Sequence, residues 1–127
     1  MGCHNNYNPT TFAITYISSS KDTKQNISVL GETTDLISGL KPYSYNYREN
    51  VESNKNYQKI KSYGLMVEES PREIINYSDY DENGIGIGNG ISINYNHLTV
   101  MLLKEVQSLR KESNSLRKEL NEIKKKF

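Results

Sequence analysis

The chain has no tryptophan and a single cysteine, Cys3. One cysteine can form neither an intrachain disulfide nor a cysteine metal cluster. The histidines, His4 and His97, are far apart in the sequence, and we expect surface or helix-start positions for them rather than a metal site. A balance of 16 basic against 15 acidic residues argues against a nucleic-acid partner. The sequence shows neither a signal peptide nor a membrane span, so we expect no membrane partner.

Phenylalanine is also scarce, at 2 residues, whereas tyrosine occurs 10 times. An apolar core must therefore rely on tyrosine, isoleucine and leucine. The 127 residues, 35% of them hydrophobic, allow one small domain at most and a C-terminal tail.

The tail, residues 98–127, has the heptad pattern of a coiled coil, with Asn94 or Asn96 as the expected helix cap. The core positions, separated by alternating steps of four and three, are Leu102, Val106, Leu109, Ser113, Leu116, Leu120, Ile123 and Phe127. In a parallel bundle, flanking residues of opposite charge would pair between chains: Glu105 with Arg110, Glu112 with Arg117, and Glu119 with Lys124. The pattern predicts self-association, but it does not determine how many helices the coiled coil contains. The alternative is a single amphipathic helix that lies on its own domain.

Short segments of alternating type precede the tail and predict an α+β body. Strands are expected at residues 11–17, 43–47 and 60–67, where β-branched and aromatic residues are frequent, and Gly64 predicts a close approach or a bulge. A helix is expected at residues 33–40, capped by Thr33 or Thr34, and another at residues 72–75, with Pro71 in its first turn. The first dozen residues and residues 48–59 are expected to be irregular. The predicted core contains Tyr43, Tyr45, Tyr47, Leu65, Val67, Leu36, Ile37 and Leu40.

Residues 79–90 contain two patterns that could suggest a ligand. Asp79, Asp81 and Asn83 match the opening of a calcium-binding EF-hand loop, but Gly90 stands at the twelfth position, where the loop needs a glutamate. The glycine-rich run does not fit the dinucleotide fingerprint and lacks the phosphate-loop lysine. The Asn-Gly pairs at residues 83–84 and 89–90 favour two chain reversals, followed by a short strand at 91–93. We therefore expect turns here, and neither a metal nor a cofactor.

Four short motifs follow one another along the chain: Ser19 with Lys24 and Gln25-Asn26-Ile27; Leu40-Lys41-Pro42-Tyr43-Ser44-Tyr45; Tyr63-Gly64-Leu65-Met66-Val67-Glu68-Glu69-Ser70-Pro71; and Ile93-Asn94-Tyr95-Asn96-His97-Leu98. In this order they resemble the intramolecular chaperone auto-processing domain. Domains of that family form the C-terminal part of phage tail fibres, tailspikes, neck appendages and endosialidases. The resemblance covers about residues 19–127.

The resemblance implies a homotrimer, in which the terminal helix forms a parallel trimeric coiled coil. The trimer would help an upstream β-rich fibre domain of the same polypeptide to fold, and would then release itself. Ser19 would be the nucleophile and Lys24 the base of a single-turnover Ser-Lys dyad that cuts between Ser18 and Ser19. Ser20 stands where the family usually has aspartate, and the adjacent serines leave the nucleophile open among Ser18, Ser19 and Ser20. In an extended chain the dyad would lie roughly 17 Å apart, so the segment must turn.

On this interpretation, residues 1–18 end the upstream fibre or lead into the domain, residues 19–94 form the chaperone body, and residues 95–127 form the coiled-coil helix. The expected location is the host cytoplasm during virion assembly, with the fragment released and absent from the mature virion. The alternative function is a trimerisation module that stays attached and has no enzymatic activity. The mass of the product expressed with its upstream partner distinguishes the two.

Overall fold

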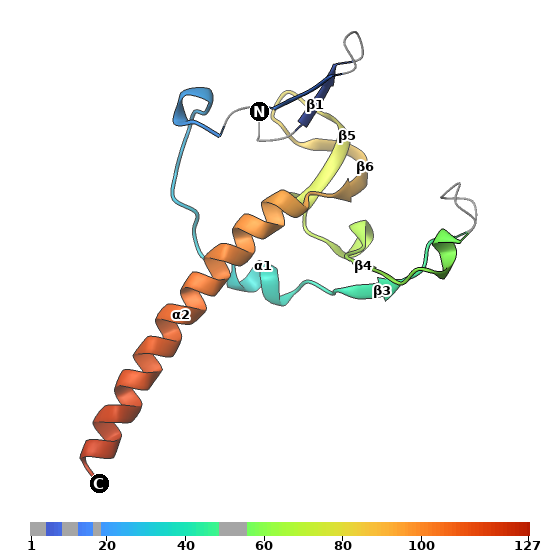
Figure 1. Ribbon diagram of the computed structural model, residues 1–127. Coiled ribbons are helices and arrows are strands. Elements are labelled where there is room, and N and C mark those ends of the chain that lie inside the picture. Colours follow the sequence, from blue (N-terminus) through green and yellow to red (C-terminus); the bar gives the residue numbers. More distant parts are fainter. Residues whose placement is uncertain (1–4, 9–12, 17–18, 49–55) are drawn as a thin grey trace. The chain divides into compact units, whose positions relative to one another are not determined.

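The computed structural model describes residues 5–8, 13–16, 19–48 and 56–127 (Figure 1). It divides into two compact units, Met1–Leu30 and Gly31–Phe127. In the first unit, β1 (Asn5–Asn8) pairs antiparallel with β2 (Ala13–Tyr16). The strand expected at residues 11–17 is confirmed for residues 13–16, and its other residues lie outside the described part of the chain. The prediction of irregular structure is wrong for residues 5–8. Backbone pairing with β2 overrides the low strand propensity of asparagine there.

The second unit is a mixed α+β structure with a long terminal helix, as predicted (Figure 1). Its elements are α1 (Thr34–Ser38), β3 (Tyr43–Tyr45), η2 (Tyr57–Lys59), β4 (Ser62–Gly64), η3 (Val67–Glu69), η4 (Arg72–Ile74), β5 (Ile75–Tyr80), β6 (Gly86–Ile93) and α2 (Tyr95–Lys125). Strand β3 pairs antiparallel with β4, and β5 pairs antiparallel with β6. The described strands thus form small two-stranded sheets rather than one extended sheet.

The core of this unit lies where the start of the β5–β6 hairpin meets the first turns of α2. Its buried side chains are Ile74, Ile93 and Leu98, and the side chains that pack against them are Ile37, Leu40, Leu65, Val67 and Met101. The core positions predicted at Ile37, Leu40, Leu65 and Val67 are therefore confirmed.

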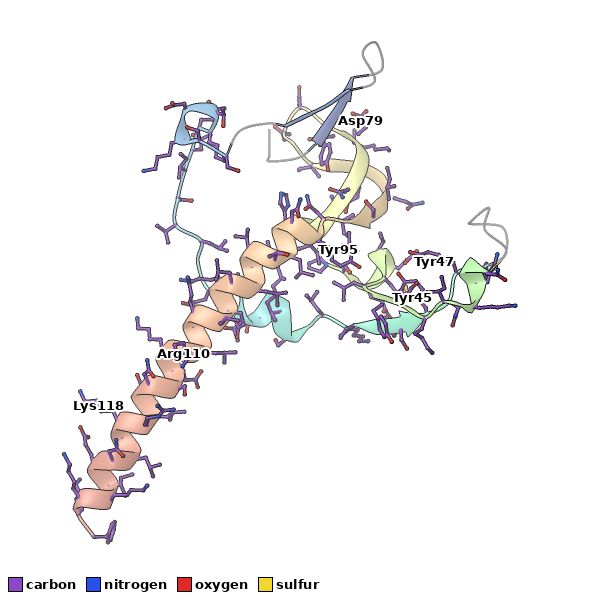
Figure 2. The ribbon with its side chains drawn as sticks, viewed as in Figure 1. Tyr45, Tyr47, Asp79, Tyr95, Arg110 and Lys118 are labelled. Atoms are coloured by element: carbon purple, nitrogen blue, oxygen red, sulfur yellow. The ribbon has the colours of Figure 1, made fainter. Side chains whose placement is uncertain are left out.

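The prediction that Leu36, Tyr43, Tyr45 and Tyr47 belong to the core is wrong. Tyr43 is 36% exposed, and its hydrogen bond with the Glu69 carboxylate raises the pKa of its phenol. Tyr45 and Tyr47 are half-buried against each other instead, edge to face with ring centroids 5.2 Å apart (Figure 2). Leu36 is half-buried outside the core cluster. The short strand β3 pairs only with β4, so these side chains do not reach the described core.

The strand predicted at residues 60–67 is confirmed only for β4, because Val67 already begins the η3 turn. The expected close approach at Gly64 is present. A Cβ atom there would lie 2.6 Å from the Tyr95 hydroxyl oxygen, which accepts a 3.1 Å hydrogen bond from the Leu65 amide. Pro71 caps η4 rather than entering its first turn, and η4 is a 3₁₀ turn that ends at Ile74.

One of the two predicted chain reversals is confirmed. Between β5 and β6, the Asp81 carboxylate accepts hydrogen bonds from the amides of Asn83 and Ile85, both 2.9 Å, and Gly84 adopts a φ of 78° that glycine favours. The reversal predicted at residues 89–90 is wrong, because both residues lie inside β6. A Cβ atom on Gly90 would clash with Ile75, so this glycine permits close contact between strands.

Helix α2 runs unbroken for 31 residues, and Asn94 caps it by accepting a 3.0 Å hydrogen bond from the His97 amide. Both features match the prediction, and residues 126 and 127 follow the last helical turn. Within the described ranges, no helix combines the length and apolar character that crossing a membrane requires.

Candidate functional site

The predicted processing segment contains a tight turn between Ser19 and Lys24. The turn is η1 (Lys21–Thr23), and Ser20 caps it: its hydroxyl accepts a 3.2 Å hydrogen bond from the Asp22 amide. The Ser20 carbonyl accepts two more hydrogen bonds from Thr23, from its amide at 3.2 Å and its hydroxyl at 2.8 Å. Lys24 closes the turn by donating its amide to the Lys21 carbonyl. A fully extended segment, which would separate the two residues widely, is thereby excluded.

Ser19 and Lys24 flank this turn, and both residues are exposed in the single chain. Ser18, the other side of the predicted cut, lies outside the described residues. The assignment of Ser19 as nucleophile and Lys24 as base stays a prediction, and the turn is the local structure on which it depends.

Ser20 is the position at which the chain departs from the resembled family, which usually has aspartate there. Serine and aspartate are both favoured at the start of a helical turn, because each places a side-chain oxygen near the free amides. Ser20 makes this contact with Asp22. The substitution therefore preserves the capping contact that an aspartate could make.

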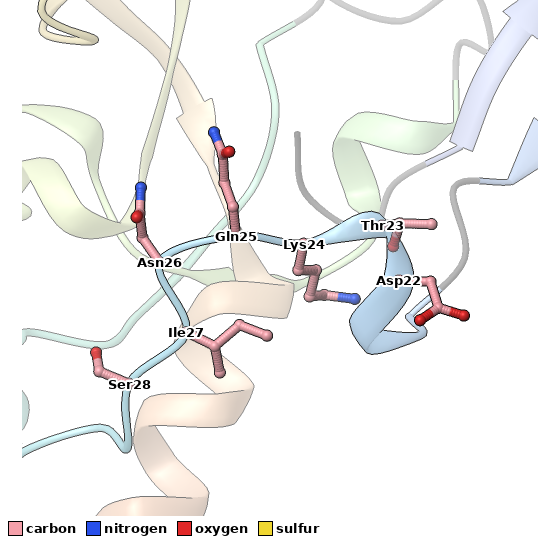
Figure 3. Close-up of a pocket in the computed structure, with 7 residues that line it drawn as sticks. All are labelled: Asp22, Thr23, Lys24, Gln25, Asn26, Ile27 and Ser28. Atoms are coloured by element: carbon pink, nitrogen blue, oxygen red, sulfur yellow. The ribbon is translucent and has the colours of Figure 1, made fainter.

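Asn26 shapes the segment after Lys24, and its role was not anticipated from the sequence. It adopts a φ of 55°, the left-handed region that few residues other than glycine tolerate, and asparagine is one of those few. The chain curls at this point, and residues 22–28 line an open hollow of about 630 Å³ (Figure 3). The Asn in the motif Gln25-Asn26-Ile27 was the available signal.

The predicted coiled-coil seam follows α2, and its apolar side chains are at least 42% exposed in the single chain. Ser113 is exposed as well, and Phe127 lies beyond the last helical residue. Figure 2 shows Arg110 and Lys118 on the C-terminal half of α2. The helix thus presents the predicted apolar row to its surroundings rather than to its own domain.

Polar contacts join the start of α1 to the middle of α2. The Glu32 carboxylate forms an ion pair of 3.8 Å with Lys104 and accepts a hydrogen bond from the Ser108 hydroxyl. The Thr34 hydroxyl donates to Glu105 at 2.8 Å. Through these contacts, the segment around Glu32 and Thr34 is held against α2, the helix that carries the predicted seam.

Thr33 makes the most buried of these contacts. It is 6% exposed and precedes α1 as predicted, but its hydroxyl does not cap that helix. The hydroxyl donates instead to the Met101 carbonyl of α2 at 2.9 Å.

The described residues contain no group of three histidine, cysteine, aspartate or glutamate side chains that could hold a metal ion. Asp81, from the EF-hand-like pattern, uses its carboxylate for the turn between β5 and β6.

The model of the family Peptidase_S74, described as chaperone of endosialidase, matches residues 19–76. Neither a curated protein nor a solved structure is significantly similar to the chain. The matched segment begins at Ser19, includes Lys24 and runs through η4 into β5. Its family name is that of a peptidase-related domain. Residues 19–76 thus match the chaperone of endosialidase family, which is consistent with an intramolecular chaperone domain.

Proposed function

We propose that this chain is an intramolecular chaperone that assembles as a parallel homotrimer through α2 and then cuts itself free before Ser19. Its folding client would be a β-rich fibre domain upstream in the same polypeptide. The observation that carries the proposal is the family match, which begins at the predicted nucleophile and includes the predicted base. The η1 turn supports the cut, and the exposed heptad row of α2 supports the assembly.

The proposed cut is an attack by Ser19 on its own preceding peptide bond. The Ser19 hydroxyl oxygen adds to the Ser18 carbonyl carbon while the neutral Lys24 amine takes the hydroxyl proton. The peptide C–N bond then breaks, the Ser19 nitrogen receives a proton, and the Ser18 acyl group remains as an ester on the Ser19 oxygen. Water hydrolyses this ester, which leaves a carboxylate on Ser18 and a free amino terminus and hydroxyl on Ser19.

Assembly of the trimer would determine when this cut occurs. A lysine can act as a base only in its neutral form, which burial and nearby positive charge favour. Ser19 and Lys24 are exposed in the single chain, and trimer formation would bring three such segments together. Cutting would then follow correct assembly. By the resemblance to phage fibre chaperones, we expect it in the host cytoplasm during virion assembly, and we expect the released fragment to be absent from purified virions.

The test is to express this segment with its natural upstream region and to determine product masses and N-terminal sequences. A fragment that begins at Ser19 should accumulate without added protease. Ser19→Ala and Lys24→Ala should each leave uncut trimers, and Lys24→Arg should not restore cutting, because arginine stays protonated.

Single Ser18→Ala and Ser20→Ala variants serve as matched controls, and both should still be cut. If one of these variants stays uncut while Ser19→Ala is cut, the nucleophile is the neighbouring serine. If none of the serine substitutions alters the product, the self-cleaving function is wrong and a trimerisation module that stays attached is the better account.

A further inference from the structure

The first turns of α2 carry two exposed apolar side chains that neither the core nor the predicted seam uses. Leu98 and Met101 belong to the chain's own core, and Leu102 is the first residue of the seam. Val100 lies between Leu98 and Met101 in the sequence and Leu103 follows Leu102, and each of the two side chains is 57% exposed. Exposed apolar residues this close to a predicted assembly seam indicate a second contact surface.

The body covers one flank of the seam, and this pair lies on the other. From Leu98 onward, a row of helix residues that contact the body recurs with steps of three, four and three: Leu98, Met101, Glu105 and Ser108. Lys104, which pairs with Glu32, lies beside this row on the side of α2 away from the seam. Successive residues of an α-helix are separated by about 100° around its axis. On this geometry, the body-contacting row lies on one side of the seam, whereas Val100 and Leu103 lie on the opposite side.

Parallel packing turns these two flanks toward each other in neighbouring chains. A residue just before the first core position of one helix lies near the residue five places further on in the next helix. For the later heptads this rule gives the charge-complementary pairs that begin with Glu105. One heptad earlier it pairs Leu98 with Leu103, and Leu98 is only 8% exposed because it belongs to its own chain's core. The side of one helix that carries Val100 and Leu103 therefore faces the neighbouring chain at Leu98, where the body of that chain packs on its own helix.

We propose that Val100 and Leu103 of each copy dock against the body of the neighbouring copy, beside the core formed by Ile74, Ile93 and Leu98. The inference rests on the proposed parallel trimer. The occupant is a second copy of this chain, because the charged pairs of the following heptads continue the same flank-to-flank contact. Each body is then held by its own helix and by the helix of a neighbour, so its position depends on the register of the coiled coil.

A photo-cross-linking residue, benzoylphenylalanine, in place of Leu103 tests the contact in the full chain. Irradiation should give covalent dimers on a denaturing gel, and mass spectrometry should map the acceptor to residues 62–98 of the second chain, which contain the core residues Ile74, Ile93 and Leu98. The matched control places the same residue at Lys111, which is exposed and lies on the side of α2 opposite the seam, and this position should give no such dimers. Cross-links confined to residues 99–125 of α2 or to the same chain, in a protein that is still trimeric, would overturn the docking proposal alone. A monomer in solution would overturn both the docking and the proposed assembly.

Leu103→Gln gives a second measurement that does not depend on photochemistry. The variant should remain trimeric, because Leu103 is not a seam residue, but its thermal midpoint should fall by several degrees. Lys111→Gln should leave the midpoint unchanged. Equal midpoints for the two variants and the unmodified chain would show that Leu103 has no partner.

Discussion

The two halves of α2 share one heptad pattern but differ in what stabilises them. The first half, residues 95–108, is fastened to the body by Leu98 and Met101 and by the polar contacts of Glu32, Thr33 and Thr34. In the second half, residues 109–125, every residue is exposed in the single chain. An isolated helix of this length is marginal in water. The body therefore stabilises the first half, whereas we propose that other copies of the chain stabilise the second half.

The largest effect is expected from a charge placed in the second half. Leu116→Asp would bring three carboxylates into one closed apolar seam, where burying an unpaired charge is very costly. The variant should sediment as a monomer, and it should also block cutting. The matched control is Asn114→Asp, which adds the same charge at an outward position and should remain trimeric. A Leu116→Asp trimer as stable as the unmodified one would contradict the seam.

The next effect concerns the anchor of the first half. Ile74→Ala removes the side chain that is 0% exposed at the centre of the core, and should lower the free energy of unfolding by about 2–5 kcal/mol. Urea denaturation followed by circular dichroism measures this loss. Ile91→Ala is the control, because its side chain on β6 is 63% exposed, and it should change stability by less than about 0.5 kcal/mol. Equal losses for the two variants would mean that the core has been misplaced.

A smaller effect is expected where α2 begins against β4. Gly64→Ala places a methyl group 2.6 Å from the Tyr95 hydroxyl, and such overpacking should cost about 1–3 kcal/mol. In a Tyr95→Phe background the cost should shrink, because the obstructing oxygen is gone. Gly31→Ala is the matched control, since a Cβ atom there would meet nothing within 4 Å. The same urea titration compares the variants, and an unchanged cost in the Phe background would refute the contact.

The smallest effect separates two glutamates at equivalent heptad positions. Glu105 accepts the Thr34 hydrogen bond within its own chain, whereas Glu112 lies in the exposed half of α2. Glu105→Ala should therefore destabilise the protein by about 0.5–1.5 kcal/mol more than Glu112→Ala. In a Thr34→Val background the two costs should become equal. If the difference persists there, Thr34 is not its source.

The sequence predicted best those features that local patterns specify. The heptad period and the Asn94 cap predicted α2, and the Asn83-Gly84 pair predicted the turn between β5 and β6. Ile74 was missed as a core residue, because it sits in a 3₁₀ turn with no apolar period around it. Gly90 was mistaken for a turn residue, since only its neighbours in space show that it serves close strand contact.

At the candidate site, the roles of Ser19 and Lys24 stay a prediction. The dyad that the family resemblance implies requires the segment between them to turn, and η1 provides a turn there. The capping by Ser20 and the left-handed conformation of Asn26 are local effects that residue type could have suggested. The roles of the dyad depend on contacts among three chains, which one sequence specifies only through its heptads and charge pairs.

The most direct measurement of the central claim is the mass of the chain in solution at micromolar concentration, by light scattering or sedimentation equilibrium. The chain has a mass of 14.6 kDa, and the proposed trimer would be a particle three times as heavy. A particle of 14.6 kDa would contradict it, because seam, docking and timed cutting all require the assembled trimer.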